Sequence, residues 1–388
     1  MSVLDFGNLS SHFDYVIFLM FLGFILGCLY PFLILSKIKK QHRFLDFIFK
    51  KREKIEKAYK ISFNLSLLGV IICYIYLFWQ VSPSTYINDP NYIKTEVDRS
   101  ILATYLALFC YVAIPLGVFQ YQLTRKRKYL IFPVLLSFLY GMSYWGRLAF
   151  FFGLISLGSS IVFVFYIFIE KNQRVNVFKS LFKILSRIFF IILVITLILT
   201  WSISFRLKSF DQSEYDPYKQ KIENSILKTI SPLFGSELAM RVTYAYIAAP
   251  IATLNYWVDR DSEYLLGQAS FPYVYRTLKK VGLFDKEITV GDENIGDGLQ
   301  LPTLPGYLYR DFGNFGVFLF MFISGFLIQF FYILAIRKEN ILTVLITISG
   351  MIYIVMGPMI NTFCQTDYLL IIVYSIVFGK YISHNNDA

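Results

Sequence analysis

The chain has 388 residues, of which 56% are hydrophobic and 19% aromatic, while only 16% are charged, and its mean hydropathy is +0.55. This composition excludes an ordinary soluble domain and predicts an all-α polytopic membrane protein. The formal net charge is +11. We interpret this excess as basic segments on anionic membrane lipid and not as a nucleic-acid surface, because the densest basic segment, at 37–60, lies between two apolar runs.

Nine apolar runs reach or approach the length of about 20 residues that crosses a bilayer. In chain order they are 15–35, 61–80, 101–123, 129–145, 148–169, 188–205, 312–336, 341–360 and 367–382. As one helix, 129–169 would measure about 60 Å, so we expect a hairpin that turns near GMSYWGR at 141–147. The first 36 residues contain no Lys or Arg, so the basic region of a signal peptide is missing and 15–35 stays as the first span.

Three regions follow from this pattern. Residues 1–205 form an N-terminal bundle of six spans, 206–311 form one long polar loop, and 312–388 form a C-terminal bundle of three spans. The loop is rich in aromatic residues, so we expect it to be ordered and to cap an active site. Its most apolar stretch, RVTYAYIAAPIATLNYWV at 241–258, is expected to lie on the membrane surface with Tyr256 and Trp257 at headgroup level.

The distribution of Lys and Arg predicts the orientation. Of the 37 in the chain, 12 lie in the long loop and 3 lie in the other connections of the same side. The remaining 22 lie in 37–60, 124–128, 170–187, 337–340 and the tail from 380. The positive-inside rule therefore places those segments in the cytoplasm, with the N-terminus outside, the C-terminus inside and the long loop on the outer side.

Cysteine and histidine usage gives no metal site. The four cysteines lie in or beside apolar runs, and the histidines, His12, His42 and His384, are far apart in sequence. We therefore expect no disulfide framework, no bound metal and no histidine acting as a general base. One alternative stays open, because Asp259 and Asp261 form an Asp-x-Asp pair of the kind that holds a divalent cation in metal-dependent glycosyltransferases.

Three segments resemble a known family. They are Arg147 after Trp-Gly at the start of a span, RVTYAYIAAPIATLN in the loop, and LPTLPGYLYRDFGNFGVFLFMFISGFL entering the seventh span. From about residue 100 onward, this series resembles the bacterial oligosaccharide repeat-unit polymerases, the O-antigen or Wzy-type polymerases. The resemblance implies a GT-C-like, metal-independent glycosyltransferase without cofactor, at the outer face of the cytoplasmic membrane. It also implies undecaprenyl-diphosphate-linked glycans as donor and acceptor, and a chain-length regulator protein as a partner.

The chemistry of such a transfer points to arginine. A sugar that leaves from a diphosphate needs cations aimed at the departing oxygens, and the planar guanidinium grips two of them at once. Charges within or beside spans are costly and are candidates for function. We predict that Arg147, Arg241 and Arg310 line the diphosphate site, with Arg206 as a fourth candidate. The alternative is that each arginine anchors a helix end.

A proton acceptor and sugar contacts complete the expected site. Asp311, next to Arg310, and Glu237 are the candidate carboxylates, although each could instead form a structural ion pair with a neighbouring arginine. Tyr244 and Tyr309 are candidate sugar-contacting residues, with interface anchoring as the alternative. Gly306 and Gly313 are expected to let the backbone bend around Arg310.

Two other activities remain open for a chain of this kind. One is an O-antigen ligase, which would move finished glycan onto a lipid core sugar. The other is a lipid-linked glycan flippase or transporter, which would carry polar residues through the middle of many spans. The span interiors are almost free of charge, and polarity gathers in the loop. This distribution favours chemistry at a surface.

Overall fold

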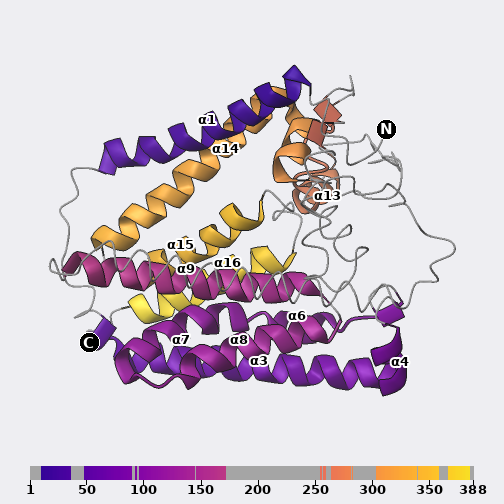
Figure 1. Cartoon of the computed structure of the whole chain (residues 1–388), viewed down its shortest axis with the longest axis vertical. Helices are drawn as coiled ribbons and strands as arrows, with labels where there is room; N and C mark the ends of the chain where they lie inside the picture. The colour runs from indigo at the N-terminus through magenta and orange to yellow at the C-terminus, as the bar shows by residue number, and fades with distance from the viewer. Residues whose placement is uncertain are drawn as a thin grey trace, which may run out of the picture. The chain divides into compact units, whose positions relative to one another are not determined.

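The structure is a computed structural model of the whole chain. It describes residues 10–35, 48–89, 92–93, 96–144, 146–171, 254–255, 257–258, 264–280, 282, 303–338, 340–357 and 366–384. Every regular element within these ranges is a helix (Figure 1), which confirms the all-helical expectation for this part of the chain. The described segments belong to two compact units. The first unit takes its segments from 1–38, 242–333 and 353–369, and the second from 39–241, 334–352 and 370–388.

Four helical stretches are long and apolar enough to cross a membrane. They are α1 (Ser11–Leu35), α3 (Arg52–Gln80), the run Ile101–Thr124 formed by α6 (Ile101–Ala107) and α7 (Cys110–Thr124), and Leu304–Arg337 within α14 (Leu304–Lys338). Shorter apolar helices are α8 (Lys128–Met142), Ala149–Phe163 within α9 (Arg147–Lys171), and α15 (Ile341–Met356). With α16 (Thr366–Ser383), helices occupy every expected span except 188–205, which lies outside the described residues. The chain thus has the helices of a multi-pass membrane protein.

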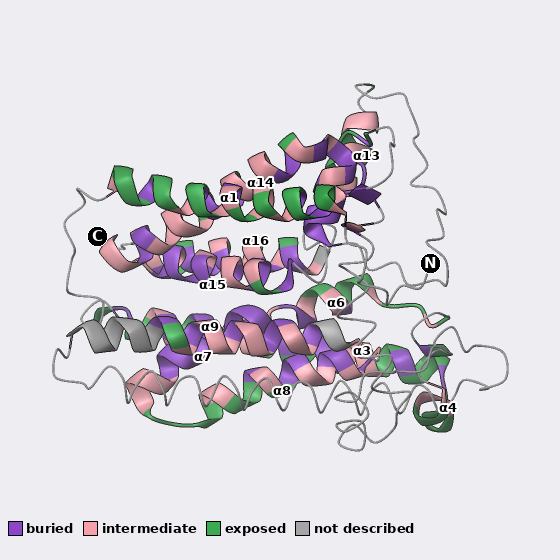
Figure 2. Ribbon diagram, turned by 45° about the horizontal axis from the view of Figure 1, so that its top comes forward, coloured by how far each residue is buried: buried purple, intermediate pink, exposed green. Residues whose placement is uncertain are grey.

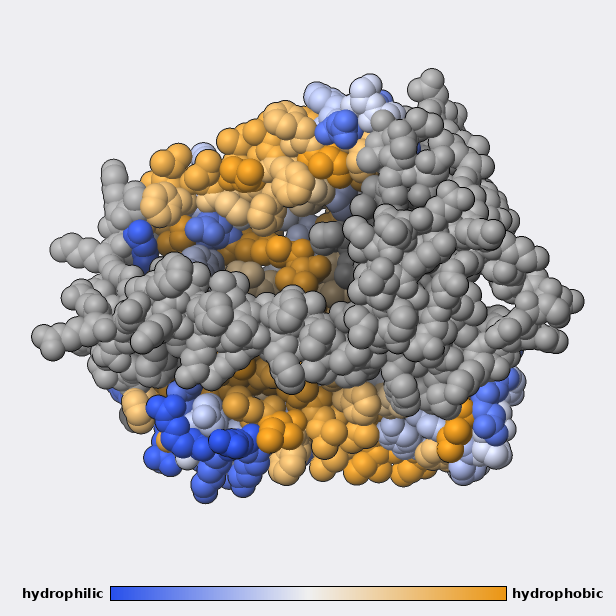
Figure 3. All heavy atoms as spheres, in the orientation of Figure 1, coloured by the Kyte–Doolittle hydropathy of each residue, from blue (hydrophilic) through white to orange (hydrophobic). Residues whose placement is uncertain are grey.

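In the second unit, α7 forms the centre of the bundle. It packs against α3, α8 and α9, and every residue from Cys110 to Gln120 is buried (Figure 2). A helix enclosed on all sides is expected to be apolar all round, as its sequence CYVAIPLGVF is up to the buried polar residue Gln120. The outer face of α3 differs, since its large apolar side chains are exposed, Trp79 by 87%. Figure 3 shows apolar residues in the middle of the surface formed by α3 and α8 and hydrophilic residues near its two ends, as a lipid-facing surface requires.

The connection between α8 and α9 is a tight turn at the expected place. The Ser143 N–H donates to the Leu139 carbonyl at 3.0 Å, and the Gly146 N–H donates to the Gly141 carbonyl at 2.8 Å. The chain then reverses and α9 begins at Arg147. The hairpin predicted from the length of the apolar run is therefore confirmed.

In the first unit, α1 and α14 approach closely through glycine. A methyl group at Gly23 would lie 2.5 Å from the Phe318 carbonyl oxygen, and one at Gly27 would overlap the Phe322 carbonyl oxygen. Gly325 of α14 packs in the same way against the Phe24 carbonyl of α1. Small residues four apart on one helix let two backbones meet, which is how apolar helices associate where no hydrophobic effect drives them together. The two helices run side by side in Figure 1.

Candidate functional site

The first turns of α14 carry the motif GYLYRDFGNFG, and the local sequence explains where this helix starts and breaks. The Thr303 hydroxyl accepts a hydrogen bond from the Gly306 N–H at 3.0 Å, which caps the helix, and Pro305 fits the first turn because no N–H is needed there. The helix then breaks at Gly313, where φ is 62° and ψ is −157°. Only glycine adopts this conformation readily, so the bend expected at Gly313 is confirmed.

Gly306 serves a different purpose from the one expected. Its backbone φ is not positive, so no bend occurs there. A methyl group at this position would lie 3.3 Å from the ring of Trp257. Gly306 therefore permits a close approach of the Trp257 ring to the helix, and the expectation that it bends the chain is wrong.

The break at Gly313 frees two carbonyl groups for tertiary contacts. In an unbroken helix, the carbonyls of Arg310 and Asp311 would accept from the N–H groups four residues later. Instead they accept from the N–H groups of Leu265, at 3.1 Å, and Leu266, at 3.2 Å. The chain reverses there through positive φ values at Leu266 and Gly267. The turn 264–271 before α13 (Pro272–Lys280) is thus bonded to the break in α14.

The side chain of Asp311 also binds the turn 264–271. It is fully buried, and its two carboxylate oxygens accept from the N–H groups of Ala269, at 3.1 Å, and Ser270, at 2.6 Å. Adjacent helical residues point about 100° apart, and within the described part of the chain Asp311 forms no ion pair with Arg310. The expectation that Asp311 pairs with its neighbouring arginine is therefore not met, and both oxygens that a general base would use bind backbone.

Arg310 points instead at Trp257. Its guanidinium carbon lies 5.1 Å from the centroid of the indole ring, a cation–π geometry, and the side chain is only 7% exposed. Trp257 is also buried and tilts against Tyr307, with ring centroids 5.6 Å apart. Trp257 was expected to face lipid headgroups. The structure corrects this, because the ring supports a buried cation inside the first unit.

The start of α1 completes the site and brings in a histidine that sequence reasoning set aside. His12 lies edge-on to Tyr309, with ring centroids 5.9 Å apart, and its Nε2 is 3.3 Å from the Asn314 side-chain nitrogen. The Tyr309 hydroxyl donates to the Val258 carbonyl at 3.4 Å. His12 is exposed and borders the residues on both sides of Arg310 and Asp311. Its distance in sequence from the motif gave no sign of this.

The remaining predicted residues are only partly covered by the structure. Arg147 is described through its backbone alone, as the first residue of α9 in the second unit. The other predicted site residues lie outside the described residues, as does the Asp-x-Asp pair, and they are Arg206, Glu237, Arg241, Tyr244, Asp259 and Asp261. Of the predicted set, the described residues thus bring together Arg310, Asp311 and Tyr309.

Comparison of the chain with family models, with curated proteins and with solved structures finds no match. The functional argument therefore depends on the residues of the site and on their chemistry.

Proposed function

We propose that the protein polymerises oligosaccharide repeat units linked to undecaprenyl diphosphate, at the outer face of a bacterial cytoplasmic membrane. In this reaction a hydroxyl oxygen of the acceptor repeat unit forms a bond to the anomeric carbon of the donor glycan. The bond between that carbon and the diphosphate oxygen breaks, and its electron pair stays on the departing diphosphate. The hydroxyl proton passes to a base on the protein.

The observation that carries this proposal is the buried guanidinium of Arg310 at the start of a long apolar helix. Burying a cation is expensive unless other groups compensate. The π-face of Trp257 offsets part of this cost and holds the side chain in place. A partly desolvated cation has a stronger effect on nearby negative charge than an exposed one. Arg310 is therefore suited to stabilise the charge that develops on a departing diphosphate.

The other groups of the site take separate roles in this proposal. Asp311 orders the turn 264–271 against the break in α14, because both of its oxygens bind that turn. His12 is the described group best suited to accept the proton, since it is exposed beside the motif and a neutral imidazole carries a nitrogen that can accept one. Tyr309, between His12 and the Val258 carbonyl, offers an aromatic face beside the same position.

The test is the glycan made by variants in the host bacterium after deletion of the native gene. With Arg310→Ala, we expect surface glycan with a single repeat unit and no polymer, and with Arg310→Lys the loss of most polymer. Arg127→Ala is the matched control, because Arg127 is exposed at the start of α8 and belongs to the other unit. It should give a polymer of normal length.

The products separate this activity from the two alternatives. A ligase defect would accumulate long lipid-linked chains, and a flippase defect would trap single repeat units on the inner leaflet. If Arg310→Ala, present at the wild-type level in the membrane, still produced polymer of wild-type length, the proposed role of Arg310 would be refuted.

A further inference from the structure

The backbone around Trp257 is fixed by two other parts of the first unit. The side-chain oxygen of Asn255 accepts a hydrogen bond from the Ser10 N–H, just before α1, at 3.1 Å. On the other side of Trp257, the Val258 carbonyl accepts from the Tyr309 hydroxyl of α14 at 3.4 Å. The start of α1 and the first turns of α14 therefore set the position of Trp257.

The indole ring of Trp257 is held in a defined orientation as well. A methyl group at Gly306 would lie 3.3 Å from Cε3 and from Cζ3 of the ring, so this edge of the six-membered ring faces α14. The indole nitrogen lies on the opposite side of the ring system, and its N–H lies in the ring plane. The Arg310 guanidinium lies over the face of the ring. The N–H thus points away from Gly306, beside a cation.

This N–H group is buried without an acceptor. The Trp257 side chain is only 6% exposed, and within the described part of the chain its Nε1 has no hydrogen-bond partner. Buried indole N–H groups usually find a partner, because an unpaired buried donor is costly. The carboxylate of Asp311 does not serve, since its oxygens accept from Ala269 and Ser270. A fixed donor that lacks an acceptor in the protein indicates an acceptor on a ligand.

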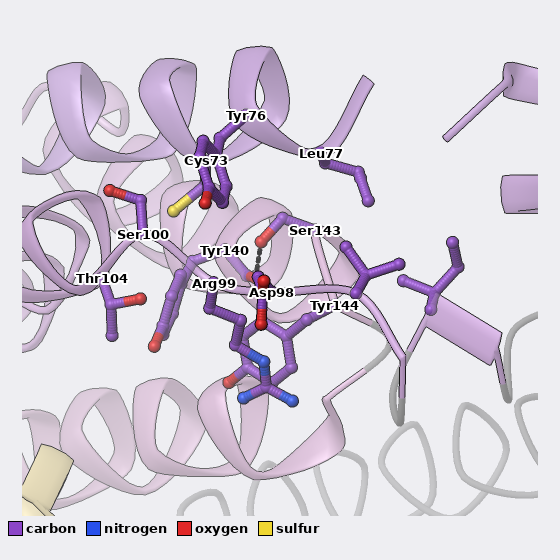
Figure 4. Close-up of a pocket in the computed structure, with 12 residues that line it drawn as sticks. Cys73, Tyr76, Leu77, Asp98, Arg99, Ser100, Thr104, Tyr140, Ser143 and Tyr144 are labelled. Atoms are coloured by element: carbon purple, nitrogen blue, oxygen red, sulfur yellow. Dashed lines mark hydrogen bonds between the residues drawn. The ribbon is translucent and has the colours of Figure 1, made fainter. Parts of the chain in front are cut away.

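The pocket between α3, the segment leading into α6, and the end of α8 in the second unit is a contrasting case (Figure 4). The Ser143 hydroxyl there donates to the Tyr140 carbonyl at 2.7 Å. Nearby, the hydroxyl of Tyr86, in α4 (Pro83–Asn88), donates to the Met142 carbonyl at 2.7 Å. The pocket holds about 20 Å³, which is room for about one water molecule. These hydroxyl groups have their acceptors within the chain, and we assign no ligand to this pocket.

We propose that the Trp257 N–H binds a phosphoryl oxygen of a diphosphate whose other oxygens contact Arg310. Both groups only donate hydrogen bonds, so their ligand must accept, and the cation favours an acceptor with negative charge. A carboxylate has two oxygens on one carbon, which a guanidinium alone can bind. A diphosphate has oxygens on two phosphorus atoms and can reach both groups. That this diphosphate belongs to the glycan carrier lipid rests on the proposed function, whereas the pair of donors does not.

Burial decides how this contact acts. Trp257 and Arg310 are only 6% and 7% exposed, so the ligand reaches them by displacing the side chains that cover them, and its association is slow. Once bound, the anion meets the N–H with little competing water, which strengthens the hydrogen bond. Trp257 then shares with Arg310 the stabilisation of the negative charge on the departing diphosphate. Trp257 is thus a binding residue as well as a support for the Arg310 side chain.

The NMR signal of the indole N–H tests the contact directly. The full chain in lipid nanodiscs is isotope-labelled at its four tryptophans, and the signal of Trp257 is identified by its loss in Trp257→Phe. Inorganic pyrophosphate should move this signal downfield, because a hydrogen bond to a phosphate oxygen deshields the proton. The signal of Trp79, which is 87% exposed in the second unit, is the control and should not move. An unmoved Trp257 signal, or an equal shift with acetate, would overturn the proposal.

Undecaprenyl diphosphate distinguishes the two sources of the ligand. If the carrier lipid is the source, it should move the Trp257 signal at a lower concentration than inorganic pyrophosphate does. Equal midpoints would support a free diphosphate as the ligand of the same donor.

Replacement of the N–H alone separates the donor from the aromatic face. Benzothienylalanine, introduced at position 257 by codon suppression, keeps the bicyclic shape but has sulfur in place of the N–H. We expect pyrophosphate binding about ten-fold weaker or more, because one hydrogen bond to an anion is lost. The melting temperature should equal or exceed that of the wild type, because a costly unpaired donor is removed. The same replacement at Trp79 is the matched control and should leave binding unchanged.

The outcomes also separate this inference from the proposed function. Wild-type affinity in the benzothienylalanine protein, or a clearly lower melting temperature, would overturn the role of the N–H. A lower melting temperature would mean that this donor already has an acceptor within the protein. If Arg310→Ala makes no polymer in that case, the proposed function still stands. Weaker pyrophosphate binding with undiminished melting supports the role of Trp257 even if the chain makes no polymer.

Discussion

The substitution Gly313→Ala tests whether the break in α14 builds the site. At φ 62° and ψ −157°, a residue with a side chain is strained by about 1–3 kcal/mol. The new methyl group would also lie 2.6 Å from the hydroxyl of the exposed Tyr264 side chain, and pushing this side chain off its rotamer costs about another 0.5–1.5 kcal/mol. We therefore expect a total destabilisation of about 1.5–4.5 kcal/mol, unless the helix straightens. Straightening would return the carbonyls of Arg310 and Asp311 to the helix and release the turn 264–271.

A double-mutant cycle separates the two contributions. Tyr264 is exposed by 55%, so Tyr264→Ala should cost little by itself, and it removes the steric contact at Gly313. In that background, Gly313→Ala should retain only the backbone term of about 1–3 kcal/mol. Gly158→Ala is the control, because Gly158 is helical within α9 and faces open space. It should be neutral or stabilise by up to about 1 kcal/mol.

The assays are melting curves of the protein in nanodiscs, followed by intrinsic fluorescence, and the length of the polymer formed in the host. Gly313→Ala should melt at a clearly lower temperature and make little polymer, and Gly158→Ala should do neither. A Gly313→Ala protein with wild-type melting and wild-type polymer would refute the reasoning. It would mean that neither the backbone conformation at Gly313 nor the docked turn is needed.

The other predictions concern single contacts. His12→Gln should lower the rate of polymerisation on the order of 10²-fold with little change in melting temperature, if His12 accepts the proton; an unchanged rate in a membrane-based assay would exclude that role. Asp311→Asn should destabilise the protein by about 2–4 kcal/mol, because the charge-assisted hydrogen bonds to Ala269 and Ser270 are lost. Limited proteolysis should then cut this variant within 264–271 and leave the same turn of the wild type intact. Gly27→Leu should separate α1 from α14, and a crosslink between cysteines placed on the two helices should be lost.

The helices could be predicted from the sequence because hydropathy reports directly on burial in lipid. The runs at 15–35, 61–80 and 101–123 end within a residue of the helices found there, at Leu35, Gln80 and Thr124. The hairpin turn followed from length alone. The helix starts were less accurate, since α3 begins at Arg52 and α14 at Leu304. Both helices continue into polar sequence, where hydrophobicity gives no signal.

The partners of the site residues could not be predicted, because they come from segments far apart in sequence. The motif itself suggested a pair of Arg310 and Asp311, but the helix directs the two side chains apart. One then meets Trp257 and the other meets the backbone of Ala269 and Ser270. His12 was likewise unpredictable, since it reaches the motif only through the packing of α1 on α14.

Arg310 and Arg99 have similar aromatic partners but differ in burial. The guanidinium of each lies over an aromatic ring, that of Trp257 or of Tyr144. Arg310 is buried, so a lysine there would bury a compact, strongly hydrated ammonium without the planar fork. Arg99 is exposed, so a lysine there would keep its water. We therefore expect Arg310→Lys to lose most polymer formation and Arg99→Lys to leave the polymer unchanged, and equal losses would contradict the role given to burial at Arg310.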